Sequence, residues 1–72
     1  MPNNLRRYRI DKGLTQQQVA DYLGFVSTDR ISRWEQGLMY PHVRNFLKLV
    51  KLYGVPAEEV YGEDVDQSAS TQ

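Results

Sequence analysis

The stretch from Thr15 to Gly37 most constrains the fold, because it holds two short helical patterns separated by a few residues. In the first, Thr15 is followed three residues later by Gln18, a spacing at which each side chain satisfies a free backbone N–H of the first turn. Gly24 ends this pattern, since glycine adopts left-handed backbone without strain. In the second, Asp29 lies in the first turn and Gly37 follows the last. We therefore expect two helices joined by one turn.

Both patterns carry a narrow apolar stripe. The residues at helical spacing are Val19, Ala20, Leu23, Ile31 and Trp34. Because the connection is so short, the two stripes must pack on each other, and Ser27 is expected to cap the second helix. Two helices joined in this way form a helix-turn-helix, a motif whose second helix enters the major groove of DNA.

The segments TQQQVA, LG, VS and ISRWEQG follow one another in this stretch. With them the chain resembles the phage-repressor-like (Cro/repressor, xenobiotic-response-element) helix-turn-helix family from Leu5 to Gly62. The resemblance implies an all-α fold, a compact bundle of five short helices like the lambda-repressor DNA-binding domain. One departure is Phe25, which stands between LG and VS where the family has no residue. We interpret Phe25 as an extra residue in the turn.

The remaining helices are predicted from caps and apolar spacing. Asn3 or Asn4 can cap a first helix that ends at Gly13, and Pro56 suits the first position of a last helix that docks through Val60 and Tyr61. The fourth helix is expected to turn one stripe toward the core, made of Val43, Phe46, Leu47, Val50 and Tyr53. Residues 1–62 then form one DNA-binding domain, and residues 63–72 are expected to be an acidic, disordered tail.

Charge and composition limit the classes of function that the chain can have. The formal net charge is zero, but residues 1–53 hold all nine Lys and Arg residues, and residues 54–72 hold five of the nine acids and no base. A local basic surface of this kind attracts phosphate. The chain has no cysteine and one histidine, which excludes disulfides and most zinc sites. No cofactor, metal or membrane association is expected, and the cytoplasm is the default location.

Base contacts are expected from the start of the second helix of the motif, on the side away from Ile31 and Trp34. The resemblance places its base-reading positions on three of these residues, Thr28, Asp29 and Arg33. Arg33 can bind guanine O6 and N7, and Asp29 either accepts from cytosine N4 or only complements the helix dipole. The candidate base-reading residues are Thr28, Asp29, Ser32 and Arg33.

Contacts to the DNA backbone are expected from polar residues around both helices. The resemblance implies that Gln16 meets a phosphate at the N-terminal end of the first helix of the motif. Arg6 and Arg30 either contact phosphates or lie on solvated helix faces. The candidate backbone contacts are Arg6, Gln16, Gln17, Arg30, Gln36 and Tyr40.

Two further contacts are expected, one within the chain and one between two chains. The resemblance implies an ion pair between Arg9 and Glu35 that joins the first helix to the recognition helix. A homodimer is expected because one short helix alone gives weak and unspecific binding. Its interface would be formed by Leu49, Leu52, Val55 and Val60. Alternatively, Leu49 and Leu52 complete the docking of the last helix within one chain.

The sequence thus predicts a DNA-binding transcriptional regulator, a repressor that binds a palindromic operator as a dimer, with a recognition helix at about residues 28–36. The alternative is an antitoxin or protein-interaction module on the same scaffold, whose partner would be a toxin or an effector. An enzyme is not expected, because no nucleophile with a base, no metal cluster and no phosphate-binding glycine loop occurs in the sequence.

Overall fold

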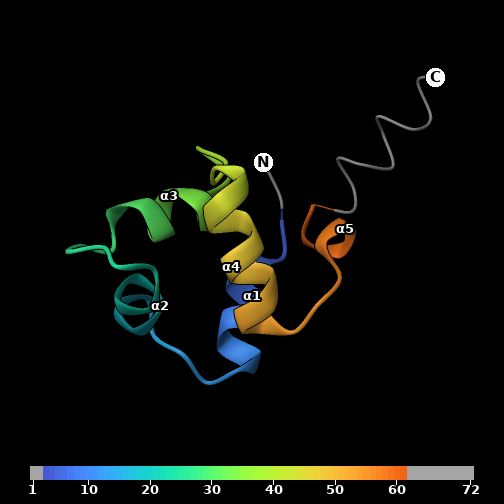
Figure 1. The fold of residues 1–72 in the computed structure, drawn as a ribbon, viewed down its shortest axis with the longest axis horizontal. Helices are drawn as coiled ribbons and strands as arrows, with labels where there is room; N and C mark the ends of the chain where they lie inside the picture. Colours follow the sequence, from blue (N-terminus) through green and yellow to red (C-terminus); the bar gives the residue numbers. More distant parts are fainter. Residues whose placement is uncertain (1–2, 62–72) are drawn as a thin grey trace.

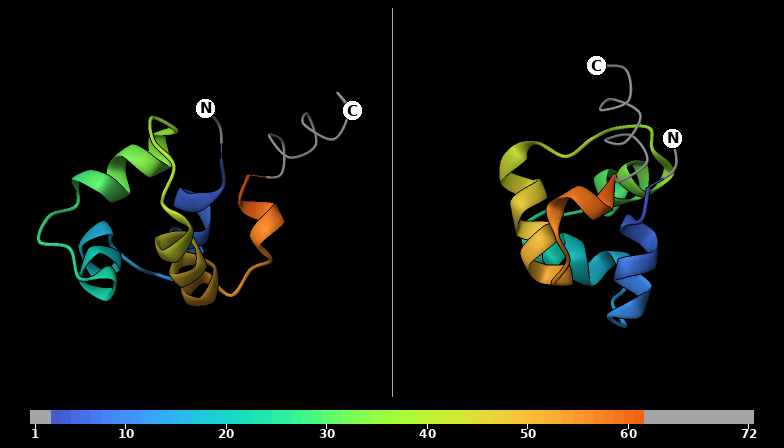
Figure 2. Two further views of the ribbon diagram at one scale, coloured as in Figure 1. Left: turned by 45° about the horizontal axis from the view of Figure 1, so that its top comes forward. Right: turned by 90° about the vertical axis from the view of Figure 1, so that its right-hand side faces the viewer.

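A computed structural model of the chain describes residues 3–61, in which five helices and no strands occur. The helices are α1 Leu5–Asp11, α2 Gln16–Leu23, α3 Asp29–Gln36, α4 Val43–Tyr53 and α5 Ala57–Val60. Helices α2 and α3 lie at one end of the molecule and α5 at the other, with α1 and α4 between them (Figures 1 and 2). The expected all-α architecture is confirmed, and the predicted tail at residues 63–72 lies outside the described residues.

Helix α2 begins and ends as its sequence predicts. The backbone N–H of Gln18 donates to Thr15 Oγ1 over 3.0 Å, and the backbone N–H of Thr15 donates to Gln18 Oε1 over 2.8 Å. These two bonds satisfy donors that the first turn of a helix leaves free. At the other end Gly24 has a φ of 82°, a left-handed conformation that favours glycine. Short-range chemistry therefore sets both ends of α2.

The start of α3 has a weaker cap. The helix begins at Asp29, whose backbone N–H donates to Ser27 Oγ over 3.4 Å, while the Thr28 side chain makes no capping bond. Ser27 therefore takes the predicted capping role, although at the long end of hydrogen-bond distances. Gly37 closes α3 with a φ of 77°.

The segment before α1 connects three parts of the fold. Asn4 occupies the N-cap position of α1 but makes no side-chain capping bond; Asn3 Oδ1 accepts from the backbone N–H of Leu5 over 3.0 Å instead. The side-chain amide of Asn3 also donates to the carbonyl of Trp34 over 2.9 Å. The backbone N–H of Asn4 donates to the carbonyl of Val60 over 3.1 Å. These bonds hold the start of α1 against α3 and α5.

All five helices contribute to one apolar core. Its buried side chains are Leu5, Tyr8, Val19, Ala20, Leu23, Ile31, Trp34, Leu49, Tyr53 and Val60. Tyr61 follows α5 and packs against two rings, with centroid distances of 5.0 Å to Tyr40 and 5.8 Å to Phe46. Val60 and Tyr61 therefore dock the last helix as predicted. None of the described helices is long and apolar enough to cross a membrane.

The buried face of α4 differs from the predicted stripe. Val43 and Leu47 are 74% and 58% exposed, whereas Leu49 is 1% exposed. Leu49 lies with Leu5, Ile31 and Trp34 around one small internal gap, so α4 turns this side toward α1 and α3. The prediction that Val43 and Leu47 face the core is wrong.

This rotation also corrects the residues assigned to a dimer interface. Leu49 and Val60 are buried within one chain and are unavailable to a second chain. Leu52 and Val55 are partly buried and pack against the same core. The alternative reading of Leu49 and Leu52, docking of the last helix within the chain, therefore describes their positions.

Two truncations test which face of α4 is buried. Leu49→Ala should lower the free energy of unfolding by about 2–5 kcal/mol, because it leaves a cavity in a packed core. Leu47→Ala makes the same chemical change at an exposed position and should change that free energy by less than about 0.5 kcal/mol. Urea unfolding followed by circular dichroism at low micromolar protein measures both. Equal losses of unfolding free energy in the two variants would show that α4 does not bury the Leu49 side.

Candidate nucleic-acid interface

Helix α3 separates a buried apolar side from an exposed polar side. Ile31 and Trp34 are 2% and 3% exposed, while Asp29, Arg33 and Gln36 lie on the solvent side. Asp29 and Arg33 are four residues apart, yet no ion pair within 4 Å joins them in the described structure. Both charged side chains are therefore available to an external ligand.

The carboxylate of Glu35, on α3, joins three helices. Glu35 Oε2 accepts from Arg9 Nε over 2.6 Å, and Glu35 Oε1 accepts from Arg9 Nη2 and from Gln16 Nε2, each over 3.1 Å. The side chains of Arg9 and Glu35 are 12% and 5% exposed. Arg9 Nη1 also donates to the carbonyl of Leu14 over 2.9 Å. The implied pair between α1 and α3 is present, and Gln16 extends it to α2.

This charge pair affects nearby titratable groups. The hydrogen bond to Glu35 raises the pKa of Arg9 above its ordinary value, although burial acts in the opposite direction. Burial also raises the pKa of Tyr53 from 10.0 to about 12. The carboxylate of Glu35 adds to that increase, and the guanidinium of Arg9 reduces it. Arg9 therefore stays charged and Tyr53 stays neutral over a wide pH range.

A polar cleft of about 400 Å³ opens beside this network, between α1, the start of α2 and α3. Six residues line it: Arg6, Arg9, Gln16, Ser32, Glu35 and Gln36. The structure thus brings together three of the predicted backbone contacts, Arg6, Gln16 and Gln36. The amide of Gln36 donates to the hydroxyl of Ser32 over 2.8 Å, so the predicted base reader Ser32 already has a partner.

The other predicted backbone contacts lie outside this cleft. Gln17 is exposed on α2, and its amide donates to Asp21 over 2.9 Å. Tyr40 lies after α3 and packs on Tyr61. Arg30 lies on the opposite flank of α3, with its guanidinium carbon 4.8 Å from the centroid of the Phe25 ring.

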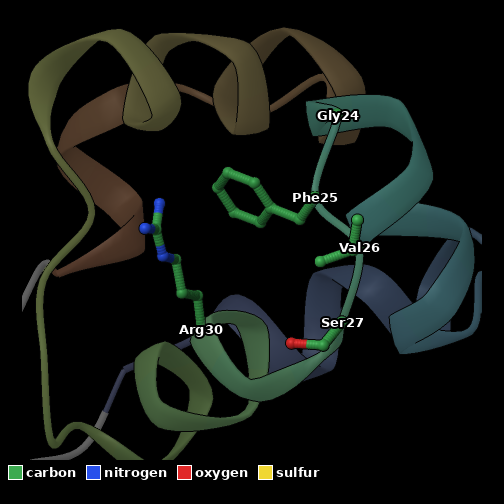
Figure 3. A pocket seen from close by; sticks show the side chains of 5 residues that line it. All are labelled: Gly24, Phe25, Val26, Ser27 and Arg30. Carbon is green, nitrogen blue, oxygen red and sulfur yellow. The ribbon is translucent and has the colours of Figure 1, made fainter.

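The turn between α2 and α3 contains a second hollow, of about 330 Å³ (Figure 3). Gly24, Phe25, Val26, Ser27 and Arg30 line it. The Phe25 ring meets Trp34 edge to face at a centroid distance of 5.8 Å, and Arg30 covers it from α3. The extra turn residue is therefore an anchor that holds the turn to the core.

Sequence reasoning missed three parts of this region. The bond from Gln16 to Glu35 was not expected, since Gln16 was assigned only to phosphate. The contact of Arg30 with Phe25 was also missed, although cations often pack on aromatic rings. Val26, part of the VS segment, was given no role of its own, and it is fully exposed in the turn. Its apolar character beside the polar residues Ser27 and Thr28 was the available signal.

Helices α2 and α3 pack on each other across one turn, and the polar face of α3 is left open. This arrangement defines a helix-turn-helix domain. The profile of the family described as "Helix-turn-helix" matches residues 5–60. The chain belongs to this helix-turn-helix family, and the expected phage-repressor-like relationship is confirmed.

Three relatives are similar to this chain. The HTH-type transcriptional activator BcrR of Enterococcus faecalis is 36% identical over 69 residues, which cover 94% of this chain and 33% of the relative. An uncharacterized HTH-type transcriptional regulator of Methanocaldococcus jannaschii is 34% identical over 93% of this chain and 100% of its own length. The cryptic phage CTXphi transcriptional repressor RstR of Vibrio cholerae is 31% identical over 85% of this chain. The chain spans a third of BcrR and about half, 54%, of RstR.

The pair of Arg9 and Glu35 is tested by a double-mutant cycle. Arg9→Ala and Glu35→Ala should each lower the free energy of unfolding by about 3–5 kcal/mol, because each leaves an uncompensated charge that is largely buried. The double variant should lose clearly less than the sum of the two losses. A domain this small has little stability to spare, so urea unfolding is measured in a fixed concentration of a stabilising osmolyte. Strictly additive losses would contradict the ion pair.

Tyr53 predicts how stability changes at alkaline pH. Below pH 10 the phenol is neutral in the folded and unfolded chain, so its contribution is fully present. As the pH rises from 10 to about 12, the unfolded chain loses this proton first, and the free energy of unfolding falls. The fall should reach about 2–3 kcal/mol. Urea unfolding across this range should show it, and Tyr53→Phe should remove that part.

The matched control for this experiment is Tyr22→Phe, since Tyr22 is 48% exposed on α2. It should keep the alkaline loss of stability of the parent chain. The same loss in Tyr53→Phe as in the parent would show that burial of Tyr53 is not its cause.

Proposed function

We propose that this chain is a sequence-specific regulator of transcription that binds double-stranded DNA with α3 in the major groove. The observation that carries the proposal is the polar face of α3, which leaves Asp29 and Arg33 exposed while Ile31 and Trp34 fix the helix to the core. The relatives are named as transcriptional regulators, which supports the same function for this chain.

Base contacts are proposed from the first two turns of α3. Arg33 is exposed and has no hydrogen bond or ion pair from its side chain among residues 3–61, so it can form a bidentate contact with guanine O6 and N7. Asp29 can accept from cytosine N4, and Thr28 at the N-cap can contact a thymine methyl. Ser32 can contribute only where DNA replaces or tolerates its bond with Gln36.

Phosphate contacts are proposed on both flanks of α3. On one flank, the cleft between Arg6, Gln16 and Gln36 has the size and the donors to hold a phosphodiester group. The backbone N–H groups at the start of α2, at Gln16 and Gln17, point the same way as the helix dipole that attracts anions. On the other flank, Arg30 presents its charge beside the turn. Such contacts fix the register of the protein without reading sequence.

We further propose repression as the direction of regulation and a two-fold dimer as the binding form. A protein that occupies a promoter can block transcription by occupancy alone, and RstR, one of the similar proteins, is named as a repressor. A dimer would place two recognition helices about 34 Å apart on a palindromic operator. Its contact would use apolar residues that remain exposed, such as Leu38 and Met39 in the connection between α3 and α4, and Val43 at the first position of α4.

A protein partner, either a toxin or an effector, stays a prediction of the sequence, and the alternative function as an antitoxin rests on it. No specific observation in the structure favours it over DNA binding. No enzymatic activity is proposed. A regulator of this kind would act in the cytoplasm, where the DNA of organisms like those of the relatives lies.

The decisive experiment is selection of bound sequences from random duplex DNA, followed by titration of two variants. Selection should enrich two inverted half-sites about 10–10.5 base pairs apart between their centres. Arg33→Ala should then weaken binding to the selected site by about 1–3 kcal/mol and weaken binding to random duplex much less. Gln16→Ala should weaken binding to both DNAs to a similar degree, because it removes a phosphate contact.

The control is Arg7→Ala, which removes one positive charge from an exposed residue on α1 outside the proposed interface. Its effect measures the influence of net charge alone. Thermal melting of each variant is needed, since Gln16 also bonds Glu35. Equal losses on both DNAs for Arg33→Ala would reassign Arg33 to the backbone. A parent chain that enriches no sequence would exclude sequence-specific binding.

A further inference from the structure

The side chain of Val26 does not contribute to the packing of the fold. Its side chain is 100% exposed, and it lies in the turn two residues before Thr28, the N-cap of α3. This turn is the outermost part of the end formed by α2 and α3 (Figures 1 and 2). An exposed valine leaves its apolar surface in water and gains none of the free energy of burial. An external apolar group that meets Val26 would recover part of that free energy.

The turn holds Val26 in a defined position, because the residues on both sides are anchored. Before it, the backbone N–H of Phe25 donates to the carbonyl of Ala20 over 2.8 Å, and the Phe25 ring packs on Trp34. After it, Ser27 accepts from the first N–H of α3. Figure 3 shows Val26 and Ser27 at the edge of the hollow, with the Phe25 ring and Arg30 within it. The methyl groups of Val26 are therefore presented beside the N-terminal end of α3.

That end of a recognition helix is the part that approaches base edges in the major groove. Among the groups displayed there, the C5 methyl of thymine is the apolar one. We propose that Val26 is a specificity-determining residue that contacts the methyl group of one thymine in each half-site. The extra residue Phe25 makes this contact possible by anchoring a longer turn. The inference rests on the proposed function, since it requires α3 to bind the major groove.

The test removes the methyl groups of protein and DNA separately. In the selected site, each thymine of the half-site is replaced in turn by deoxyuridine, which lacks only the C5 methyl. Dissociation constants are measured for the parent chain and for Val26→Ala. At one position the parent should lose about fourfold in affinity. Val26→Ala should bind the thymine site about fourfold more weakly than the parent and lose nothing further at that position.

The matched control is Ile10→Ala, which truncates another exposed apolar residue, 55% exposed, near the end of α1. It should respond to deoxyuridine as the parent does. Thermal melting should show both variants folded, because neither side chain is buried.

Each other outcome has one meaning. If the parent and Val26→Ala lose the same affinity at every thymine, the inference is overturned while DNA binding stands. A uniform weakening in Val26→Ala without dependence on thymine also overturns it, because the side chain then acts through something other than a methyl contact. A parent chain that selects no sequence refutes the proposed function and the inference with it.

Discussion

The carboxylate of Glu35 is the point on which the arrangement of the first three helices depends. A charge with a side chain only 5% exposed is stable there only if strong donors replace the water it has lost. Arg9 supplies two such donors from α1, and Gln16 supplies one from α2. Because Glu35 lies on α3, these bonds fix α3 against both neighbours. The same group therefore sets the fold and the angle at which α3 would meet DNA.

The features that the sequence predicted well depend on residues close together in the chain. The bonds between Thr15 and Gln18, and the glycines that end α2 and α3, involve partners within one helical turn. The pair of Arg9 and Glu35 spans 26 residues and was expected only through the family resemblance. Nothing in the spacing of charges alone would have selected Glu35 as the partner of Arg9. Local chemistry therefore predicted the elements, and the resemblance supplied their long-range connection.

The face of α4 was mispredicted because its pattern permits more than one answer. Seven of its eleven residues, VRNFLKLVKLY, are apolar, and they surround most of the helix. Helical spacing selects several stripes of similar quality from such a pattern. Tertiary packing selects one of them: Leu49 lies with Leu5, Ile31 and Trp34 in the core, and Val43 and Leu47 remain in solvent. These partners on α1 and α3 lie far from Leu49 in the chain, so the spacing within α4 does not predict them.

The proposed DNA interface separates residues that hold the fold from residues that are free to specify DNA. Val26, Asp29 and Arg33 are exposed, so substitutions there should alter recognition at little cost in stability. Gln16 and Ser32 differ, because each already has a hydrogen-bond partner within the chain. A DNA contact by either side chain must share or replace that bond, which reduces its net contribution to affinity. The sequence preference of this domain should therefore depend mainly on the connection between α2 and α3 and on the first two helical turns of α3. Gln16 should link a DNA contact to the hydrogen bonds around Glu35.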